Sequence, residues 1–263
     1  MIKSVPRIAF RNLWKQKGIS LINIIGLSMG IASSLIIALF VIYELSFDKF
    51  HENTGNIYKV YQHSMVEGEE SRDAWTPVPI AAALKAECPE VKEVVRLAQT
   101  DDIQISSEEN YFEIENGLYV DSSFFSIFSF DLVMGDKNKV LSEPRSIVLT
   151  ETTARKIFGN ENPVNKLIRF EADTGYFKVT GISQDPPENS HFDYNMLISM
   201  DGFWDHKSQF WLRSNVNTYV LLQEGIPAIQ LEEKFPGLID KYIGPQLHQV
   251  TGISLEDFTG KGN

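Results

Sequence analysis

The sequence predicts an α+β protein in which one transmembrane helix precedes an extracytoplasmic domain. That domain is predicted to have two β-α-β-like halves with a β-rich insertion between them. Three observations support this prediction. Residues 19–43 form a run of 25 uncharged residues. The chain after them alternates strand-like and helix-like segments without low complexity. The charge is divided, since residues 1–43 hold five Lys and Arg and no Asp or Glu, whereas residues 44–263 hold 19 Lys and Arg against 35 Asp and Glu.

The uncharged segment is long enough to cross a bilayer. As a helix it would extend about 37 Å, against a hydrocarbon core of about 30 Å. All five cations precede it, so the positive-inside rule places the N-terminus in the cytoplasm and residues 44–263 outside the cytoplasmic membrane. A cleaved signal peptide is the alternative, but its apolar region has about 7–15 residues and ends at a small-residue cleavage site. Here the apolar run is much longer and ends at Val41-Ile42-Tyr43, without such a site directly before Glu44.

Small and polar residues recur at helical spacing within this segment, at Asn23, Gly26, Gly30 and Ser34. Gly26 and Gly30 form a GxxxG pair, which allows a second helix to approach closely. Asn23 is costly in lipid unless it faces protein or the membrane interface. We therefore predict a helix-packing face here. Chance is the alternative, because Gly and Ser are common in membrane helices.

The segment 1–18 is predicted to form an amphipathic helix on the cytoplasmic membrane surface. Ile2, Val5, Ala9 and Leu13 share one face of such a helix, and Lys and Arg surround them. An apolar face beside cationic residues is typical of a helix that lies in the plane of the membrane interface.

A β-α-β unit is predicted over about 56–99, as the first half of the extracytoplasmic domain 44–263. Asn56–Gln62 and Val91–Leu97 are predicted as its strands. Thr76-Pro77 is predicted as the N-cap and first residue of the intervening helix, which should end near Cys88.

The β-rich insertion is predicted over about 100–190. Asp121 is expected to cap a turn rich in phenylalanine, and Thr150 to cap a helix over 151–158 with Gly159 just past its end. The predicted strands are short and comprise Asp102–Ser106, Tyr111–Glu115, Ser146–Leu149, Leu167–Phe170 and Tyr176–Ile182.

The second half is predicted over about 192–258. A helix should begin near Pro227, and its apolar face continues across Pro236, which predicts a kink or a restart there. The predicted strands of this half are Asp193–Ile198, Thr218–Leu222 and a final strand at Ile253–Phe258.

The sequence offers no positive evidence for an enzyme, and we predict no catalytic residue, cofactor or metal site. Gly260-Lys261 lacks the preceding glycine of a phosphate loop. The single cysteine, Cys88, excludes an intrachain disulfide framework, and the chain contains no HExxH or GxSxG motif. The net charge of −11 argues against nucleic acid as a partner. The acidic pairs are expected to be solvated loops and comprise Glu69-Glu70, Asp101-Asp102 and Glu108-Glu109.

Two further groups have both a functional and a structural interpretation. Asp48 and His51 have helical spacing and could meet a metal, but we expect them to be solvated. Phe203-Trp204 and Phe210-Trp211 could form an extracellular binding patch. Burial in the core is the expected alternative for these aromatic side chains.

Two groups of motifs carry a resemblance to a known family. The first comprises Ile8–Leu13, Lys17 and Ile19–Leu27. The second comprises Thr153–Gly159, Asn162-Pro163, Lys166, Val179–Ile182, Asp185-x-Pro187 and Ser190–Phe192.

The first group resembles the start of FtsX-like ABC-transporter permeases, and the second is similar to the MacB-type periplasmic core domain of those permeases. The resemblance runs from about residue 6 to about residue 258. One departure is Asn165, where the family usually has Gly before the Lys. Asn tolerates the left-handed backbone region better than most residues, so the turn is expected to persist.

The resemblance implies a function and a set of partners. Family members have four or more membrane helices, pair with a cytoplasmic ABC ATPase and work as two permease units. The resemblance also allows a periplasmic adaptor as a further partner. Membrane lipid would surround the helix. The chain would then be the N-terminal portion of a permease in the inner membrane, or a truncated gene product, because it stops before a second hydrophobic span. Its core domain would couple cytoplasmic ATP hydrolysis to export or mechanical work outside the membrane.

Two other classes of function remain as alternatives. The first is a single-span membrane receptor with an extracytoplasmic ligand-binding domain. The cytoplasmic arm of about 18 residues argues against it, because that arm is too short for an output domain. The second is an anchored extracytoplasmic enzyme, which the missing catalytic motifs disfavour.

Overall fold

The computed structural model describes residues 11, 14–66, 69–100, 102–107, 110–171 and 175–258. The chain divides into two compact units, Met1–Asp48 and Lys49–Asn263. The residues of the predicted amphipathic face lie outside the described part of the chain, and these are Ile2, Val5, Ala9 and Leu13.

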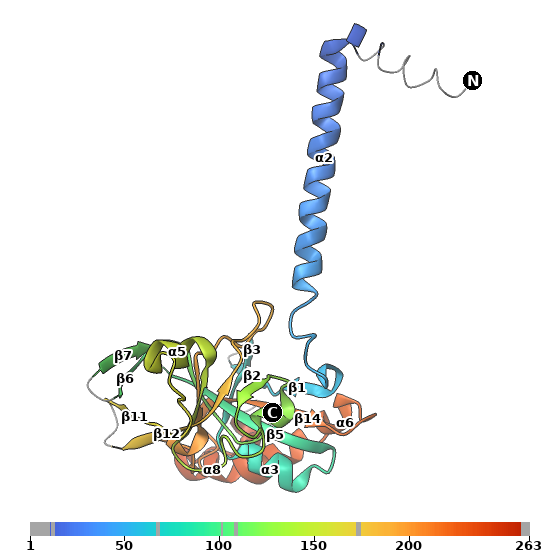
Figure 1. The fold of residues 1–263 in the computed structure, drawn as a ribbon. Coiled ribbons are helices and arrows are strands. Elements are labelled where there is room, and N and C mark those ends of the chain that lie inside the picture. Colours follow the sequence, from blue (N-terminus) through green and yellow to red (C-terminus); the bar gives the residue numbers. More distant parts are fainter. Residues whose placement is uncertain are drawn as a thin grey trace. The chain divides into compact units, whose positions relative to one another are not determined.

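The first unit contains one long helix, α2 (Lys17–Glu44), drawn in blue in Figure 1. It is continuous over 28 residues, and none of its residues is buried. Within the described residues it is the one helix long and apolar enough to cross a membrane. The predicted segment 19–43 lies inside it, so the helix prediction is confirmed. Apolar side chains exposed over its whole length need lipid or other helices to cover them.

The second unit is built on a mixed sheet that has twelve strands in the described residues. The sheet order is β1-β14-β5-β8-β13-β10-β12-β11-β6-β7, with β4 beside β14 and β9 beside β12. A separate hairpin pairs β2 (Gln62–Val66) with β3 (Glu69–Asp73). The strands of the large sheet are β1 (Ile57–Lys59), β4 (Trp75–Pro77), β5 (Val91–Gln99), β6 (Ile103–Ser107), β7 (Asn110–Ile114), β8 (Gly117–Val120), β9 (Leu132–Met134), β10 (Ser146–Thr150), β11 (Leu167–Phe170), β12 (Tyr176–Ser183), β13 (Met196–Ser199) and β14 (Ser214–Leu222).

Short helices connect and cover these strands (Figure 1). They are α3 (Ile80–Glu87), α4 (Phe124–Ile127), α5 (Glu151–Phe158), α6 (Ala228–Glu232), α7 (Phe235–Leu238), α8 (Gly244–Thr251) and α9 (Leu255–Phe258). Two 3₁₀ turns, η2 (Thr54–Asn56) and η3 (Met200–Gly202), and one π-helical segment, η4 (Ile239–Ile243), complete the unit. The helix predicted near Pro227 begins at Ala228 and restarts at Phe235 with Pro236 in its first turn, as expected.

The predicted β-α-β connection is present in part. The chain order is β1, the hairpin β2-β3, β4, α3 and β5, so three unpredicted strands precede the helix, and β14 lies between β1 and β5 in the sheet. Both β1 and β5 pair antiparallel with β14, so they run parallel to each other on either side of it. The connecting helix α3 buries Leu84 completely, in a hydrophobic cluster that also contains Val220 of β14 and Leu238 of α7. The helices α3, α6 and α7 therefore cover one face of this part of the sheet.

The predicted start of that helix is wrong. Thr76 and Pro77 belong to β4, and α3 begins at Ile80. The Thr76 hydroxyl lies 2.7 Å from the Thr218 hydroxyl and donates to the Val216 carbonyl at 3.0 Å. These buried cross-strand hydrogen bonds keep the Thr-Pro pair in the sheet.

The helix predicted over 151–158 is confirmed in full as α5. The Thr150 side chain accepts a hydrogen bond from the Thr153 N–H at 3.3 Å, and Gly159 follows the helix with φ 61°. Asn165 has φ 70°, so the left-handed turn expected from the resemblance is present.

Two other local predictions are wrong. The predicted last strand is instead the short helix α9, where the Ser254 hydroxyl accepts a hydrogen bond from the Asp257 N–H at 3.1 Å and caps the turn. The Asp121 carboxylate does not cap α4. It accepts hydrogen bonds from the Arg96 N–H at 2.8 Å, Nε at 2.9 Å and Nη2 at 2.7 Å, and its backbone carbonyl alone reaches the Phe124 N–H.

Candidate functional site

The first residues of the second unit are fixed by hydrogen bonds to a loop more than 70 positions away. His51 is 5 % exposed, and its Nδ1 accepts a hydrogen bond from the Ser129 N–H at 3.1 Å. The Glu52 N–H donates to the Ser129 hydroxyl at 2.9 Å. His51, Glu52 and Ser129 are referred to below as the His51 anchor.

Aromatic packing reinforces the His51 anchor. The His51 ring lies 5.3 Å from Phe128 and 5.2 Å from Phe130, and the Phe50 ring lies 5.5 Å from Phe130. Such edge and tilted contacts each contribute about 0.5–1.5 kcal/mol beyond the area that they bury. Phe128 and Phe130 belong to a core cluster that includes buried residues of β5, β8 and β14. The chain therefore enters the second unit attached directly to the core of the sheet.

The expectation that His51 would be solvated is wrong. Imidazole has an apolar ring and two polar nitrogens, so it can be buried when a nitrogen has a partner. The backbone N–H of Ser129 supplies that partner, and phenylalanine rings surround the rest of the ring. Nothing in the sequence near His51 indicates this pairing.

The connection between α2 and the His51 anchor is short. It spans residues 45–50, and its first part continues the helix by backbone hydrogen bonds. The Leu45 N–H donates to the Val41 carbonyl at 2.9 Å, and the Ser46 N–H donates to the Tyr43 carbonyl at 3.0 Å. The connection contains no glycine or proline, so its composition is unlike that of a flexible linker.

The predicted packing residues of α2 lie together on the helix surface. Apart from the backbone of α2 itself, a Cβ added at Gly26 or Gly30 would meet no atom of the described residues within 4 Å. The Ser34 hydroxyl donates to the Gly30 carbonyl at 2.9 Å, so the helix itself satisfies that donor. Asn23 is exposed on the same helix. The helix-packing role of Asn23, Gly26, Gly30 and Ser34 stays a prediction.

The described residues contain no group of three or more His, Cys, Asp and Glu side chains that could hold a metal ion.

Cys88 is 1 % exposed, and burial raises the pKa of its thiol, so the reactive thiolate is disfavoured. Asp102 is exposed, as expected for a solvated loop. The side chains of Glu69 and Glu70, and the whole of Asp101, Glu108 and Glu109, lie outside the part that the structure describes.

The paired aromatic residues separate into buried and exposed members. Phe203 and Trp211 are buried, as the core interpretation predicted. Trp204 is 73 % exposed and Phe210 is 36 % exposed, so for these two that interpretation is wrong. The Arg213 guanidinium lies 5.6 Å from the Trp204 ring centre and covers part of it.

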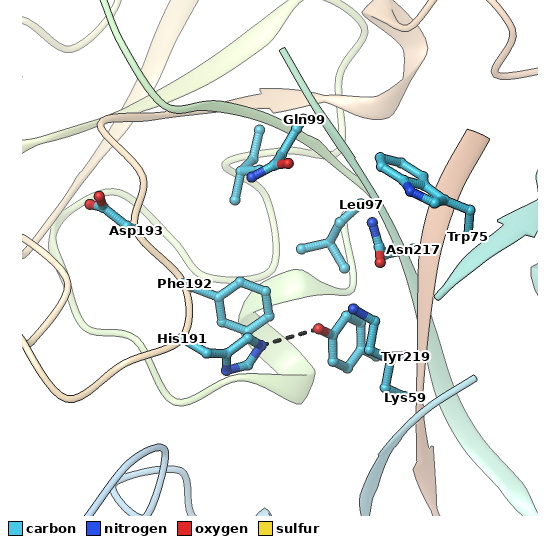
Figure 2. A pocket seen from close by; sticks show the side chains of 10 residues that line it. Lys59, Trp75, Leu97, Gln99, His191, Phe192, Asp193, Asn217 and Tyr219 are labelled. Carbon is cyan, nitrogen blue, oxygen red and sulfur yellow. Dashed lines mark hydrogen bonds between the residues drawn. The ribbon is translucent and has the colours of Figure 1, made fainter. Parts of the chain in front are cut away.

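The second unit also contains several cavities that the sequence did not indicate, and two of them have linings suited to a ligand. The larger, about 580 Å³, is mainly apolar and lies among β4, α3 and η4, with Ile80, Trp211 and Ile243 in its lining. The smaller, about 260 Å³, is polar on one side and is shown in Figure 2. Each is lined by segments far apart in the sequence, so no local motif marks it.

Comparison with known proteins gives a consistent result. The family model for the MacB-like periplasmic core domain matches residues 20–238. The crystal structure of a domain of a putative permease protein from Porphyromonas gingivalis has a TM-score of 0.65 at 20 % identity, covering 74 % of this chain and 84 % of that chain. The periplasmic region of MacB from Actinobacillus actinomycetemcomitans has a TM-score of 0.50 at 16 % identity, covering 76 % of this chain and 86 % of that one. No curated protein matches the sequence.

Proposed function

Because the chain belongs to the family of MacB-like periplasmic core domains of ABC-type permeases, we propose that it couples ATP hydrolysis to work outside the membrane. In this proposal the chain is the N-terminal portion of a permease subunit. A cytoplasmic ATPase, separate or fused, supplies the energy, and α2 carries the motion to the periplasmic domain. The work is export of a substrate or a mechanical action on an extracytoplasmic partner.

The His51 anchor is the observation that carries this proposal. A force applied at the end of α2 reaches the sheet only if the chain between them is short and its far end is fixed. The connection has six residues, 45–50, and ends at a buried histidine held by Ser129 and two phenylalanine rings. Movement of α2 is then transmitted to the core instead of being absorbed by a linker.

The proposal gives the chain a cytoplasmic N-terminus, because the five cations of residues 1–43 all precede the apolar segment. A cysteine introduced by Ser71→Cys tests this, since Ser71 lies on β3 and is exposed. The native Cys88 is buried and gives little background. An impermeant thiol reagent should label the variant in intact cells with a permeabilised outer membrane. Labelling only after lysis would contradict the orientation.

A second permease unit is part of the proposal, and the small-residue face of α2 is its proposed contact. A periplasmic adaptor is a further partner that the proposal allows.

The periplasmic domain acts by binding and by movement and performs no chemistry of its own. The purified protein, assayed with common ester, phosphate and peptide substrates, should therefore show no hydrolytic or metal-dependent turnover. Robust turnover would favour an anchored enzyme instead.

Coupling is tested by inserting a flexible Gly/Ser segment of about ten residues after Glu44, in a complete permease that contains this chain. We expect transport to fall steeply while ATPase turnover is largely retained. The matched control places the same insertion after Gly225, an exposed turn between β14 and α6. Full transport with the insertion after Glu44 would overturn the mechanical proposal.

A further inference from the structure

The register of β1, β14, β5 and β8 places polar and apolar side chains together on one face of the sheet, where they form the floor of a cavity. Side chains at paired positions of neighbouring strands lie on the same face. The pairs that form this floor are Lys59 with Tyr219, Asn217 with Leu97, and Gln99 with Leu118. Figure 2 shows these side chains around one cavity of about 260 Å³.

Two other segments provide the walls of this cavity. Trp75 of β4 lies opposite Asn217 in the register and is 37 % exposed. On the other side stands the loop with His191 and Phe192, where the His191 Nε2 lies 3.1 Å from the Tyr219 hydroxyl (Figure 2). The cavity therefore has an aromatic wall at each side and a floor that changes from cationic to apolar.

Lys59 supplies the positive charge of the cavity. Its Nζ lies 5.5 Å from the ring centre of Tyr219 and 5.7 Å from that of Tyr61. Among the described residues no carboxylate lies within ion-pair distance of it, and burial lowers the pKa of its ammonium group. A cation that is partly removed from water and faces aromatic rings is stabilised further by an anion beside it.

Three more groups around the cavity have unused hydrogen-bonding capacity within the described part of the chain. They are the side-chain amides of Gln99 and Asn217 and the indole N–H of Trp75. The Asp193 carboxylate, by contrast, accepts a hydrogen bond from Asn116 Nδ2 at 2.9 Å and points away from the other lining side chains in Figure 2. The groups available to a ligand are thus one cation, two amides and one indole.

We propose that this cavity binds a small amphipathic carboxylate. The carboxylate lies at the Lys59 ammonium and accepts from the Asn217 amide, and the apolar part of the ligand contacts Leu97, Leu118 and Trp75. A single lysine matches the one negative charge of a carboxylate, whereas the higher charge of phosphate is usually met by additional donors, such as a bidentate Arg or a helix N-terminus. The volume suits a ligand of amino-acid size. Such a group is supplied by a free organic acid or by the C-terminus of a peptide.

Binding is tested with the full chain in lipid nanodiscs, by calorimetric titration with N-acetyl-L-phenylalanine. We expect saturable binding in the millimolar range or tighter, after subtraction of a titration into empty nanodiscs. The neutral N-acetyl-L-phenylalanine amide should bind at least tenfold more weakly. No saturable binding, or equal binding of acid and amide, would overturn the proposal.

Variants test the position of the site. Lys59→Met keeps the apolar stem and removes the charge, and it should weaken acid binding at least tenfold. Lys92→Met makes the same change at an exposed position of β5 and should leave the affinity unchanged. Circular dichroism checks that each variant is folded. If Lys59→Met is not folded, the comparison of acid with amide binding by the unaltered chain still tests whether the cavity binds a carboxylate.

Two peptides distinguish the sources of the carboxylate. N-acetyl-Gly-Ala-Phe with a free C-terminus should bind as well as the free acid if the natural ligand is a peptide end, and its C-terminal amide should bind weakly. Binding of the free acid without the peptide assigns the site to small organic acids. None of these titrations requires an ATPase or a second permease helix, so their failure would be separate from a failure of the coupling proposal.

Discussion

The imidazole of His51 accepts a hydrogen bond from the backbone N–H of Ser129 at 3.1 Å, across 78 positions of the chain. The bond ties the first residues of the periplasmic unit to the loop that follows α4. Because the adjacent Glu52 N–H donates to the Ser129 hydroxyl, the two segments exchange donor and acceptor roles. Both the stability of the unit and the proposed transmission of movement from α2 depend on this pair.

Replacing His51 by Ala should destabilise the periplasmic unit by about 2–4 kcal/mol, because it leaves a cavity and removes the partner of a buried N–H. Urea unfolding followed by tryptophan fluorescence, to which the buried Trp211 contributes, measures this. The control is His248→Ala, since His248 is exposed on α8 and its loss should change the free energy of unfolding by less than about 0.5 kcal/mol. Equal midpoints for the two variants would show that the anchor contributes nothing.

Replacing Thr150 by Ala should cost about 1 kcal/mol, because the Thr153 N–H loses its cap and Thr150 is fully buried. Thr150→Ser retains the hydroxyl oxygen and should recover most of that loss. Thermal or urea unfolding of the two variants provides the comparison. A Ser variant as unstable as the Ala variant would assign the effect to the lost methyl group instead of the cap.

The elements that the sequence predicted well are those with complete local signals. The helix over 151–158 has its cap, its buried Ala154 and Ile157, and its terminating glycine within ten consecutive residues. The strand predicted at Leu167–Phe170 alternates between exposed and buried residues, and the strand predicted at Tyr176–Ile182 does so over its first six residues. Local hydrogen bonding and side-chain alternation are sufficient to determine such segments.

The features that the sequence did not predict depend on partners far along the chain. Thr76-Pro77 has the composition of a helix start, but hydrogen bonds to β14, 140 positions later, hold it in a strand. His51 gave no sign of burial, because its partner is the backbone of Ser129. The cavity around Lys59 combines β1, β5, β8 and β14 with a loop, and only the register of the sheet brings those residues together.

Glu87 should make stability depend on pH. Hydrogen bonds from Lys241 Nζ, at 2.8 Å, and from the Tyr242 hydroxyl hold the pKa of this carboxyl below its ordinary value. A carboxyl whose pKa is lowered by folding stabilises the protein fully above its unfolded pKa of about 4.3, and that contribution is lost as the pH falls through the folded pKa.

Glu87→Gln should therefore lower the urea midpoint at pH 7, and the difference from the unaltered chain should disappear near pH 3. The effect should be small and should shrink at high salt, because Lys241 is exposed and Glu87 is partly exposed to solvent. Glu224→Gln, at an exposed position with no ion pair to any described residue, is the control and should show no such trend. A difference that persists unchanged to pH 3 would assign the effect to packing instead of charge.

The face of α2 that carries Gly26 and Gly30 should determine how the permease helices associate. Around a helix with 3.6 residues per turn, positions 26 and 30 lie within about 40° of each other, and Asn23 and Ser34 lie close to the same side. Replacing both glycines by Ile adds bulk where another backbone would approach, because no side chain in the described part of the chain occupies that space. Chemical cross-linking in membranes should then show a clear loss of dimer.

The matched control is the pair Ser28→Ile and Ala32→Ile, which adds bulk at the same spacing on the opposite side of α2. If the small residues form the contact, the Ser28→Ile/Ala32→Ile variant should cross-link as strongly as the unaltered chain, although it is more hydrophobic than that chain. Equal cross-linking of all three proteins would mean that Gly26 and Gly30 face lipid. Loss of cross-linking in both double variants would mean that the helix is surrounded by protein, and that the small-residue face does not by itself select the partner.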